Sequence, residues 1–123
     1  MNRIKLSALG LALLSSASFA GDCKQPAAPE LPDGAKSSME QMLEGQKAVK
    51  AFQTANLEYM GCLEKEFTAA EAASKEGSDE EKAAAMEKHG KAVDAYNAAV
   101  SKEEEVAGEF NTQIREYKAA NPG

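Results

Sequence analysis

The stretch KEGSDEE (residues 75–81) separates two long runs of sequence, neither of which contains a proline. Gly77 can take the left-handed backbone conformation in which many helices end, and Ser78 or Asp79 can cap a following helix. Glu80 and Glu81 then fall in a first helical turn, where negative charge is favoured. We therefore predict two helices, at about 38–75 and 79–118, joined by a short link.

Each of these runs carries an apolar stripe. Ser37 and Glu40 fit a capping box at the start of the first run, because each side chain can satisfy a backbone N–H of the other. Beyond it, apolar residues recur mostly in steps of three and four, as one face of a helix requires. They are Met39, Met42, Val49, Phe52, Tyr59, Leu63 and Phe67 in the first run and Met86, Val93, Tyr96, Val100, Ala107, Phe110, Ile114 and Tyr117 in the second, where His89 shares the stripe and Glu103 interrupts it.

Folding the chain at this link brings together residues whose numbers sum to about 155, as in an antiparallel helical hairpin. Phe67 then faces His89, and Gly45 faces the large ring of Phe110. Apolar residues meet along most of the length, and this agreement between the two stripes favours the hairpin. The sequence predicts an all-α fold, with a long, coiled-coil-like, antiparallel two-helix hairpin as a domain at 37–119.

A proline-rich segment, which we call the strap (residues 21–36), precedes the hairpin. Pro26, Pro29 and Pro32 recur every third residue, and proline disfavours helix both at its own position and at the preceding one. We expect the strap to be extended, close to polyproline II, with a turn at Asp33 and Gly34.

The two cysteines of the chain, Cys23 and Cys62, lie at the start of the strap and inside the first predicted helix. The helix from Ser38 to Cys62 spans about 36 Å. The segment from Cys23 to Ser38 spans about 46 Å if it is extended, but only about 22 Å if it is helical. An extended strap can therefore run back along the first helix and form a disulfide with Cys62, and Gly61 would leave room for the incoming backbone.

The N-terminus has the features of a cleavable secretory signal peptide (residues 1–20), with cleavage after Ala20. Arg3 and Lys5 precede a short apolar run, and small residues stand at Ser18 and Ala20. A lipoprotein signal ending at Cys23 is the alternative, although Asp22 replaces the small residue that such signals place before the cysteine. Cleavage would lower the 14 basic residues to 12 and leave all 20 acidic ones, a formal net charge of −8.

These features predict a periplasmic protein with one disulfide, because exported proteins with an even number of cysteines usually pair them. The acidic chain disfavours binding to nucleic acid and to anionic membrane surfaces. After the signal peptide, no apolar stretch approaches the length of a membrane span, so we expect no membrane insertion.

Several of these motifs together resemble a family of small, uncharacterised exported proteins of proteobacteria. They are Cys23 with its following prolines, Pro32-Asp33-Gly34, Tyr59-x-x-Cys62 and Phe110-Asn111-x-x-x-Arg115-x-Tyr117. The resemblance covers most of the chain after the signal peptide. It supports export and the disulfide, and it implies no activity and no site residues.

The last of these motifs is also a candidate interaction patch, formed by Phe110, Asn111, Arg115 and Tyr117. Phe110 and Tyr117 are one heptad apart, and aromatic residues and arginine are enriched in binding hot spots. The alternative is that both rings pack on the first helix, near Gly45, while Arg115 pairs with a glutamate.

Metal-binding patterns in the chain are weak. His89 is the single histidine, with Glu66, Glu71 and Glu87 as carboxylates at no fixed spacing. The acidic residues 79–81 lack the spacing of a calcium loop. The methionines Met39, Met42, Met60 and Met86 could bind copper, but most lie on the predicted stripes and fit core packing better. We predict no metal, no cofactor and no catalytic residue.

A two-helix hairpin has a thin core, so a third layer, a disulfide or self-association must supplement it. We expect a non-enzymatic structural or protein-interaction module, whose partner is an unknown envelope protein or a second copy of the chain. The alternative function is a periplasmic carrier of a small ligand or metal.

Overall fold

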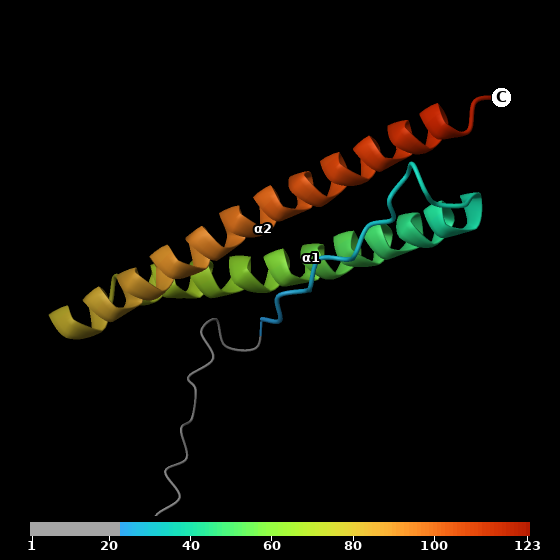
Figure 1. Ribbon diagram of the computed structural model, residues 1–123. Coiled ribbons are helices and arrows are strands. Elements are labelled where there is room, and N and C mark those ends of the chain that lie inside the picture. The colour runs from blue at the N-terminus through green and yellow to red at the C-terminus, as the bar shows by residue number, and fades with distance from the viewer. Residues whose placement is uncertain (1–22) are drawn as a thin grey trace, which may run out of the picture.

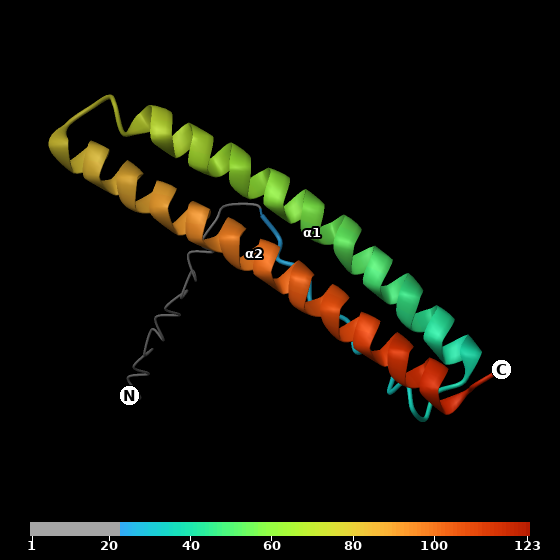
Figure 2. The ribbon, with the colours of Figure 1, turned by 90° about the horizontal axis from the view of Figure 1, so that it is seen from above.

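The computed structural model describes residues 23–123, so the predicted signal peptide and its cleavage after Ala20 lie outside the described residues. Within that part of the chain, two helices, α1 (Met39–Ala73) and α2 (Asp79–Ala120), run antiparallel along their whole length (Figures 1 and 2). The predicted ranges, 38–75 and 79–118, differ from these bounds by at most two residues. The all-α hairpin is confirmed.

Helix α1 begins with a capping box one residue later than predicted. Ser38 Oγ accepts from the N–H of Gln41 at 3.2 Å, and Gln41 Oε1 accepts from the N–H of Ser38 at 2.8 Å. The sequence SSMEQ fits the capping pattern twice, as Ser37 with Glu40 and as Ser38 with Gln41. A glutamine amide oxygen accepts this bond as a glutamate does, and the helix uses the second pair.

The link between the helices has the predicted chemistry. Gly77 has a φ of +90°, which a residue with a Cβ rarely adopts. Ser78 is the cap of α2, since its hydroxyl accepts from the N–H of Glu81 at 3.2 Å. Residues 79–81 are all acidic and occupy the first turn of α2, where the helix dipole favours them.

The interface between α1 and α2 follows a heptad pattern. Buried residues of α1 alternate in steps of three and four, which keeps them on one side of the helix. They are Met42, Gly45, Val49, Phe52, Asn56, Tyr59, Leu63 and, one heptad further, Ala70. The buried residues of α2 are Ala92, Ala99, Val106 and Phe110. The buried alanines of α2 thus meet larger residues of α1, whereas Phe110 meets Gly45, and the helices pack closely.

The register of the hairpin agrees with the predicted sum. The buried amide of Asn56 donates to the carbonyl oxygen of Ala99 at 3.0 Å. Phe67 contacts His89 edge to face, with ring centroids 6.0 Å apart. The residue numbers of these two pairs sum to 155 and 156, close to the predicted sum of 155.

The predicted stripes were wrong at some positions. Met39 and Met86 are exposed, whereas Ala92, Ala99 and Val106 are buried and were not in the stripe of the second run. The physical reason is that the closest helix contact is made by small side chains. A search for large apolar residues selects the flank of α2 in place of its centre.

The strap forms a third layer on one side of the hairpin. In Figure 1 it leaves the middle of α1 and rises towards α2 near the C-terminus. Leu31 packs against the core cluster around Phe52 and Phe110. A turn follows at residues 33–36, where the N–H of Lys36 donates to the carbonyl oxygen of Asp33 at 3.1 Å. The strap therefore lies over both helices, and not along α1 alone.

Two glycines allow this approach, and Gly61 is not one of them. A Cβ on Gly45 would lie 2.7 Å from the ring of Pro32 and 3.2 Å from that of Phe110. A Cβ on Gly34 would overlap the carbonyl oxygen of Gln113. A Cβ on Gly61 would meet nothing within 4 Å, because it would point about 100° around the helix from Cys62, to which the strap is joined. The expected role of Gly61 was therefore wrong.

Candidate functional site

The Cys23–Cys62 disulfide attaches the start of the strap to α1. The two Cα atoms are 5.5 Å apart, and the residues are separated by 39 positions. The predicted disulfide is confirmed, and both cysteines of the chain are used in it. Its sulfur atoms therefore act as a covalent connection and not as free thiols.

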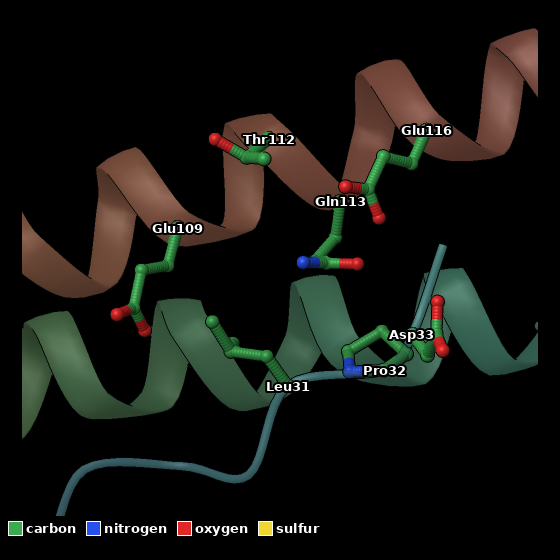
Figure 3. Close-up of a pocket in the computed structure, with 7 residues that line it drawn as sticks. All are labelled: Leu31, Pro32, Asp33, Glu109, Thr112, Gln113 and Glu116. Atoms are coloured by element: carbon green, nitrogen blue, oxygen red, sulfur yellow. The ribbon is translucent and has the colours of Figure 1, made fainter. Parts of the chain in front are cut away.

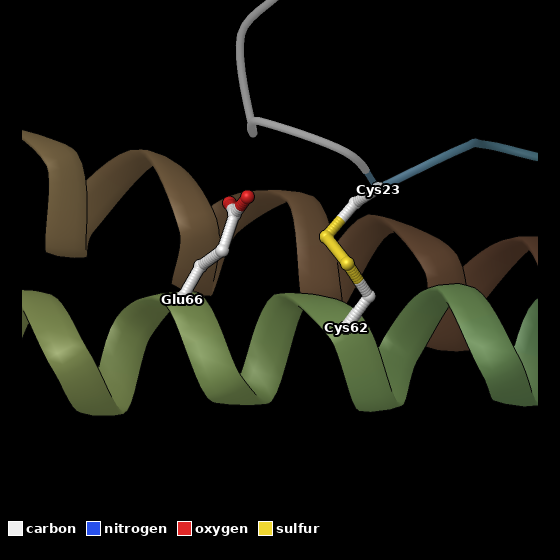
Figure 4. Close-up of side chains that lie close together, drawn as sticks. All are labelled: Cys23, Cys62 and Glu66. Carbon is white, nitrogen blue, oxygen red and sulfur yellow. A yellow bond between two sulfur atoms is a disulfide. The ribbon is translucent and has the colours of Figure 1, made fainter.

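One carboxylate lies beside this disulfide. Glu66, one turn further along α1, places an oxygen within 4.8 Å of both sulfur atoms (Figure 4). Among residues 23–123 this is the one group of three potential metal ligands that lie close together, and it does not include His89. Because disulfide sulfur lacks the thiolate charge that metals require, the group fits a covalent tether better than a metal site.

The described part of the strap, residues 23–36, borders two open hollows. One, of about 560 Å³, lies between Leu31, Pro32 and Asp33 of the strap and four side chains of α2, Glu109, Thr112, Gln113 and Glu116 (Figure 3). The other, of about 370 Å³, lies between residues 23–26 and the α1 residues Ala55, Glu58, Tyr59 and Cys62. Both are open to solvent. Neither encloses a ligand in the way that ligand pockets usually do.

The first hollow is bordered by charge of one sign. Asp33, Glu109 and Glu116 place three carboxylates around it, and Gln113 crosses it to accept a hydrogen bond from the N–H of Gly34 at 2.8 Å. The polar groups here hold the strap to α2. Their negative charge disfavours an anionic ligand.

The residues of the candidate interaction patch do not form one exposed surface. Phe110 is 7% exposed and belongs to the core, and Tyr117 is half-buried against the same cluster. Asn111 and Arg115 are exposed, and Arg115 donates a hydrogen bond to Thr112 Oγ1 at 3.0 Å. Both rings therefore contribute to packing, and the surface part of the motif is polar.

The exposed apolar side chains lie on a surface separate from the candidate interaction patch. Four large apolar residues are exposed in the described chain: Met39 (57%), Leu43 (50%), Leu57 (59%) and Met86 (64%). At 100° per residue, the three on α1 lie on the side of that helix away from Ala55 and Cys62, which the strap covers. The exposed apolar residues are thus concentrated where the strap is absent.

Helix α2 continues this surface. Its residues next to the buried positions, on the side away from Glu109 and Gln113, are apolar at every heptad. They are Met86, Val93, Val100, Ala107 and Ile114, and all but Met86 are half-buried. On α1 the half-buried Met60 and Phe67 occupy the equivalent flank. We call this surface the strap-free face, consisting of Met39, Leu43, Leu57, Met60, Phe67, Met86, Val93, Val100, Ala107 and Ile114.

No protein-family model, curated protein or solved structure matches this chain. The resemblance to exported proteobacterial proteins therefore stays a prediction based on the sequence motifs. Neither described helix has an apolar stretch suited to crossing a membrane.

The sequence contains a signal for the strap-free face. The stripe predicted for the second helix includes Met86, Val93, Val100, Ala107 and Ile114, which repeat at helical spacing and were expected at the contact between the helices. Two adjacent stripes, one of small and one of larger apolar residues, run along α2. A helix with two such stripes has more apolar surface than one partner helix can cover.

Proposed function

We propose that this protein is a non-enzymatic interaction module of the periplasm, which binds another protein through the strap-free face. The observation that carries the proposal is that Met39, Leu43, Leu57 and Met86 are all exposed on one side of a 101-residue described region, Cys23–Gly123. Large apolar side chains gathered on one exposed face, among polar ones, mark interaction sites in soluble proteins.

The proposed periplasmic location is supported by the signal-peptide features of residues 1–20 and by the disulfide. A single disulfide between Cys23 and Cys62 is typical of an oxidising compartment, where it persists. The strap supports the interaction role as well. It covers one flank of the hairpin, which leaves the opposite flank for a partner.

Site-specific photo-crosslinking in intact cells tests this function. A photoreactive residue in place of Leu57 should give a covalent adduct of discrete mass, because this side chain would lie inside the interface. The same residue in place of Ala51 is the matched control, since Ala51 is exposed on α1 and points away from the strap-free face. No adduct at Leu57, or equal adducts at both positions, would contradict the proposal.

A further inference from the structure

We infer that the partner of the strap-free face is a second copy of this chain, and that two hairpins pack through it into a four-helix bundle. This inference rests on the proposed function and names its partner. In the proposed dimer both hairpins point the same way, and α1 of each copy lies against α2 of the other. The two-fold axis then runs parallel to the hairpins.

The positions of the apolar residues support this orientation. The bond between Asn56 and Ala99 sets which residues of α1 and α2 lie at the same height in one hairpin. In the proposed dimer both hairpins point the same way, so residues of α1 and α2 that lie level within one hairpin also lie level between the two copies. Leu57 then lies level with Val100 of the second copy, and Leu43 lies level with its Ile114.

The opposite orientation fits these residues less well. If α1 packed antiparallel on α1 about Leu57, Leu43 would lie level with Glu71 of the second copy. Met39 would lie beyond Ala73, where α1 ends. Two of the exposed apolar side chains of α1 would then face a carboxylate or solvent, which removes much of the gain from burial. The antiparallel register that pairs Leu43 with Leu57 is centred on Lys50, so it would place two like charges opposite each other at the two-fold axis.

Charge at the borders of the face supports a second copy as the partner. Lys50 lies on α1 midway between Leu43 and Leu57, one heptad from each, and is exposed. Glu104 occupies the corresponding border of α2 at nearly the same height and is also exposed. These residues border opposite edges of the face in one hairpin, and neither takes part in an ion pair of the described chain.

Between copies the two charges would meet. In the proposed orientation Lys50 of each copy lies against Glu104 of the other, so the symmetric dimer contains this pair twice. The face is therefore complementary to itself in charge as well as in apolar pattern, as an interface with two-fold symmetry requires.

Sedimentation velocity over a range of protein concentrations tests the dimer, on the protein purified with its disulfide intact. The expected result is a reversible monomer–dimer equilibrium. Leu57→Glu should raise the dissociation constant by about a hundredfold or more, since it removes two buried leucines per dimer and adds two buried charges. A far-UV circular dichroism spectrum equal to that of the unchanged protein shows that the variant has folded.

Charge exchange tests the orientation. Lys50→Glu and Glu104→Lys should each weaken the dimer by about tenfold, because each replaces two attractive pairs by two repulsive ones. The double variant should restore the original dissociation constant. Lys65→Glu is the matched control, since it makes the same change on an exposed side of α1 that faces away, and it should leave association nearly unchanged.

The outcomes separate this inference from the proposed function. A protein that stays monomeric at all concentrations, but still gives an adduct with a different protein at Leu57 in cells, overturns the dimer and leaves the interaction module standing. A monomer with no adduct at Leu57 overturns both. A dimer in which the double charge exchange restores nothing overturns the proposed orientation.

Discussion

The N–H of Gly34 donates to Gln113 Oε1 at 2.8 Å, and this bond connects the turn of the strap to α2 across 79 positions of sequence. The disulfide holds the other end of the strap on α1, so the strap bridges the two helices. Its attachment to α2 depends on Gly34 having no side chain, because a Cβ there would overlap the Gln113 carbonyl and lie 2.9 Å from the Tyr117 nitrogen.

Gly34→Ala should lower the free energy of unfolding by about 1–3 kcal/mol, as inserting a methyl group into a packed contact usually does. The atoms it would meet belong to the backbone of α2, which cannot move aside as a flexible side chain can. Urea denaturation followed by circular dichroism measures the change. Hydrogen exchange at the amide of residue 34 would show whether the strap has separated from α2.

Gly61→Ala is the control for this prediction. It adds the same methyl group to a helix, with nothing within 4 Å of the new atom. The free energy of unfolding should rise by about 0.5–1 kcal/mol, because alanine is the better helix former. If the two substitutions had equal effects, the close contact at Gly34 would not be what limits that position.

The sequence predicted the strap better than it predicted the core. Three regularly spaced prolines and the distance from Cys23 to Cys62 were enough to place an extended segment beside α1, because proline geometry and helix rise are local properties. The contact of Gly34 with Gln113 is not local. It depends on how far the strap crosses from α1 to α2, which no pattern in residues 23–36 determines.

The core shows a similar limit. Phe110 against Gly45 and Phe67 against His89 followed from folding the chain at the link. The sequence did not predict the burial of Ala92, Ala99 and Asn56, because small or polar residues contribute little to an apolar periodicity. They are buried because two helices approach closely enough for an alanine carbonyl to accept a hydrogen bond from a facing amide.

Removing the disulfide should destabilise the protein without unfolding it at room temperature. Closing a loop of this length contributes about 4 kcal/mol in the chain-entropy model. The double substitution Cys23→Ser and Cys62→Ser should lower the free energy of unfolding by about that amount, because the unfolded chain regains the lost freedom. Thermal and urea denaturation of the oxidised protein and of the double variant measure the difference.

Treatment with a reducing agent provides the control for this change. The original protein should lose the same stability on reduction, whereas the double variant should lose none. The contacts of Leu31 and Gly34 remain in both, so the turn of the strap should stay on α2 while the Cys23 end separates from α1. If reduction removed amide protection over the whole strap, the expectation that only its Cys23 end separates would be contradicted.

Asn56→Asp should be among the most destabilising changes in the hairpin. Asn56 is buried, and its amide N–H₂ is the donor to the Ala99 carbonyl. A carboxylate there would place a buried charge beside an acceptor oxygen with no donor between them, which costs about 3–5 kcal/mol. Chemical denaturation at neutral pH measures the loss.

Asn56→Leu separates the effect of charge from the loss of the hydrogen bond. It removes the bond as well, but it adds no charge, and the Ala99 carbonyl still accepts the N–H four residues further along α2. The free energy of unfolding should therefore stay within about 1.5 kcal/mol of the original. Equal losses for the two variants would indicate that the cost comes from the lost hydrogen bond to Ala99, which both variants share, and not from the buried charge.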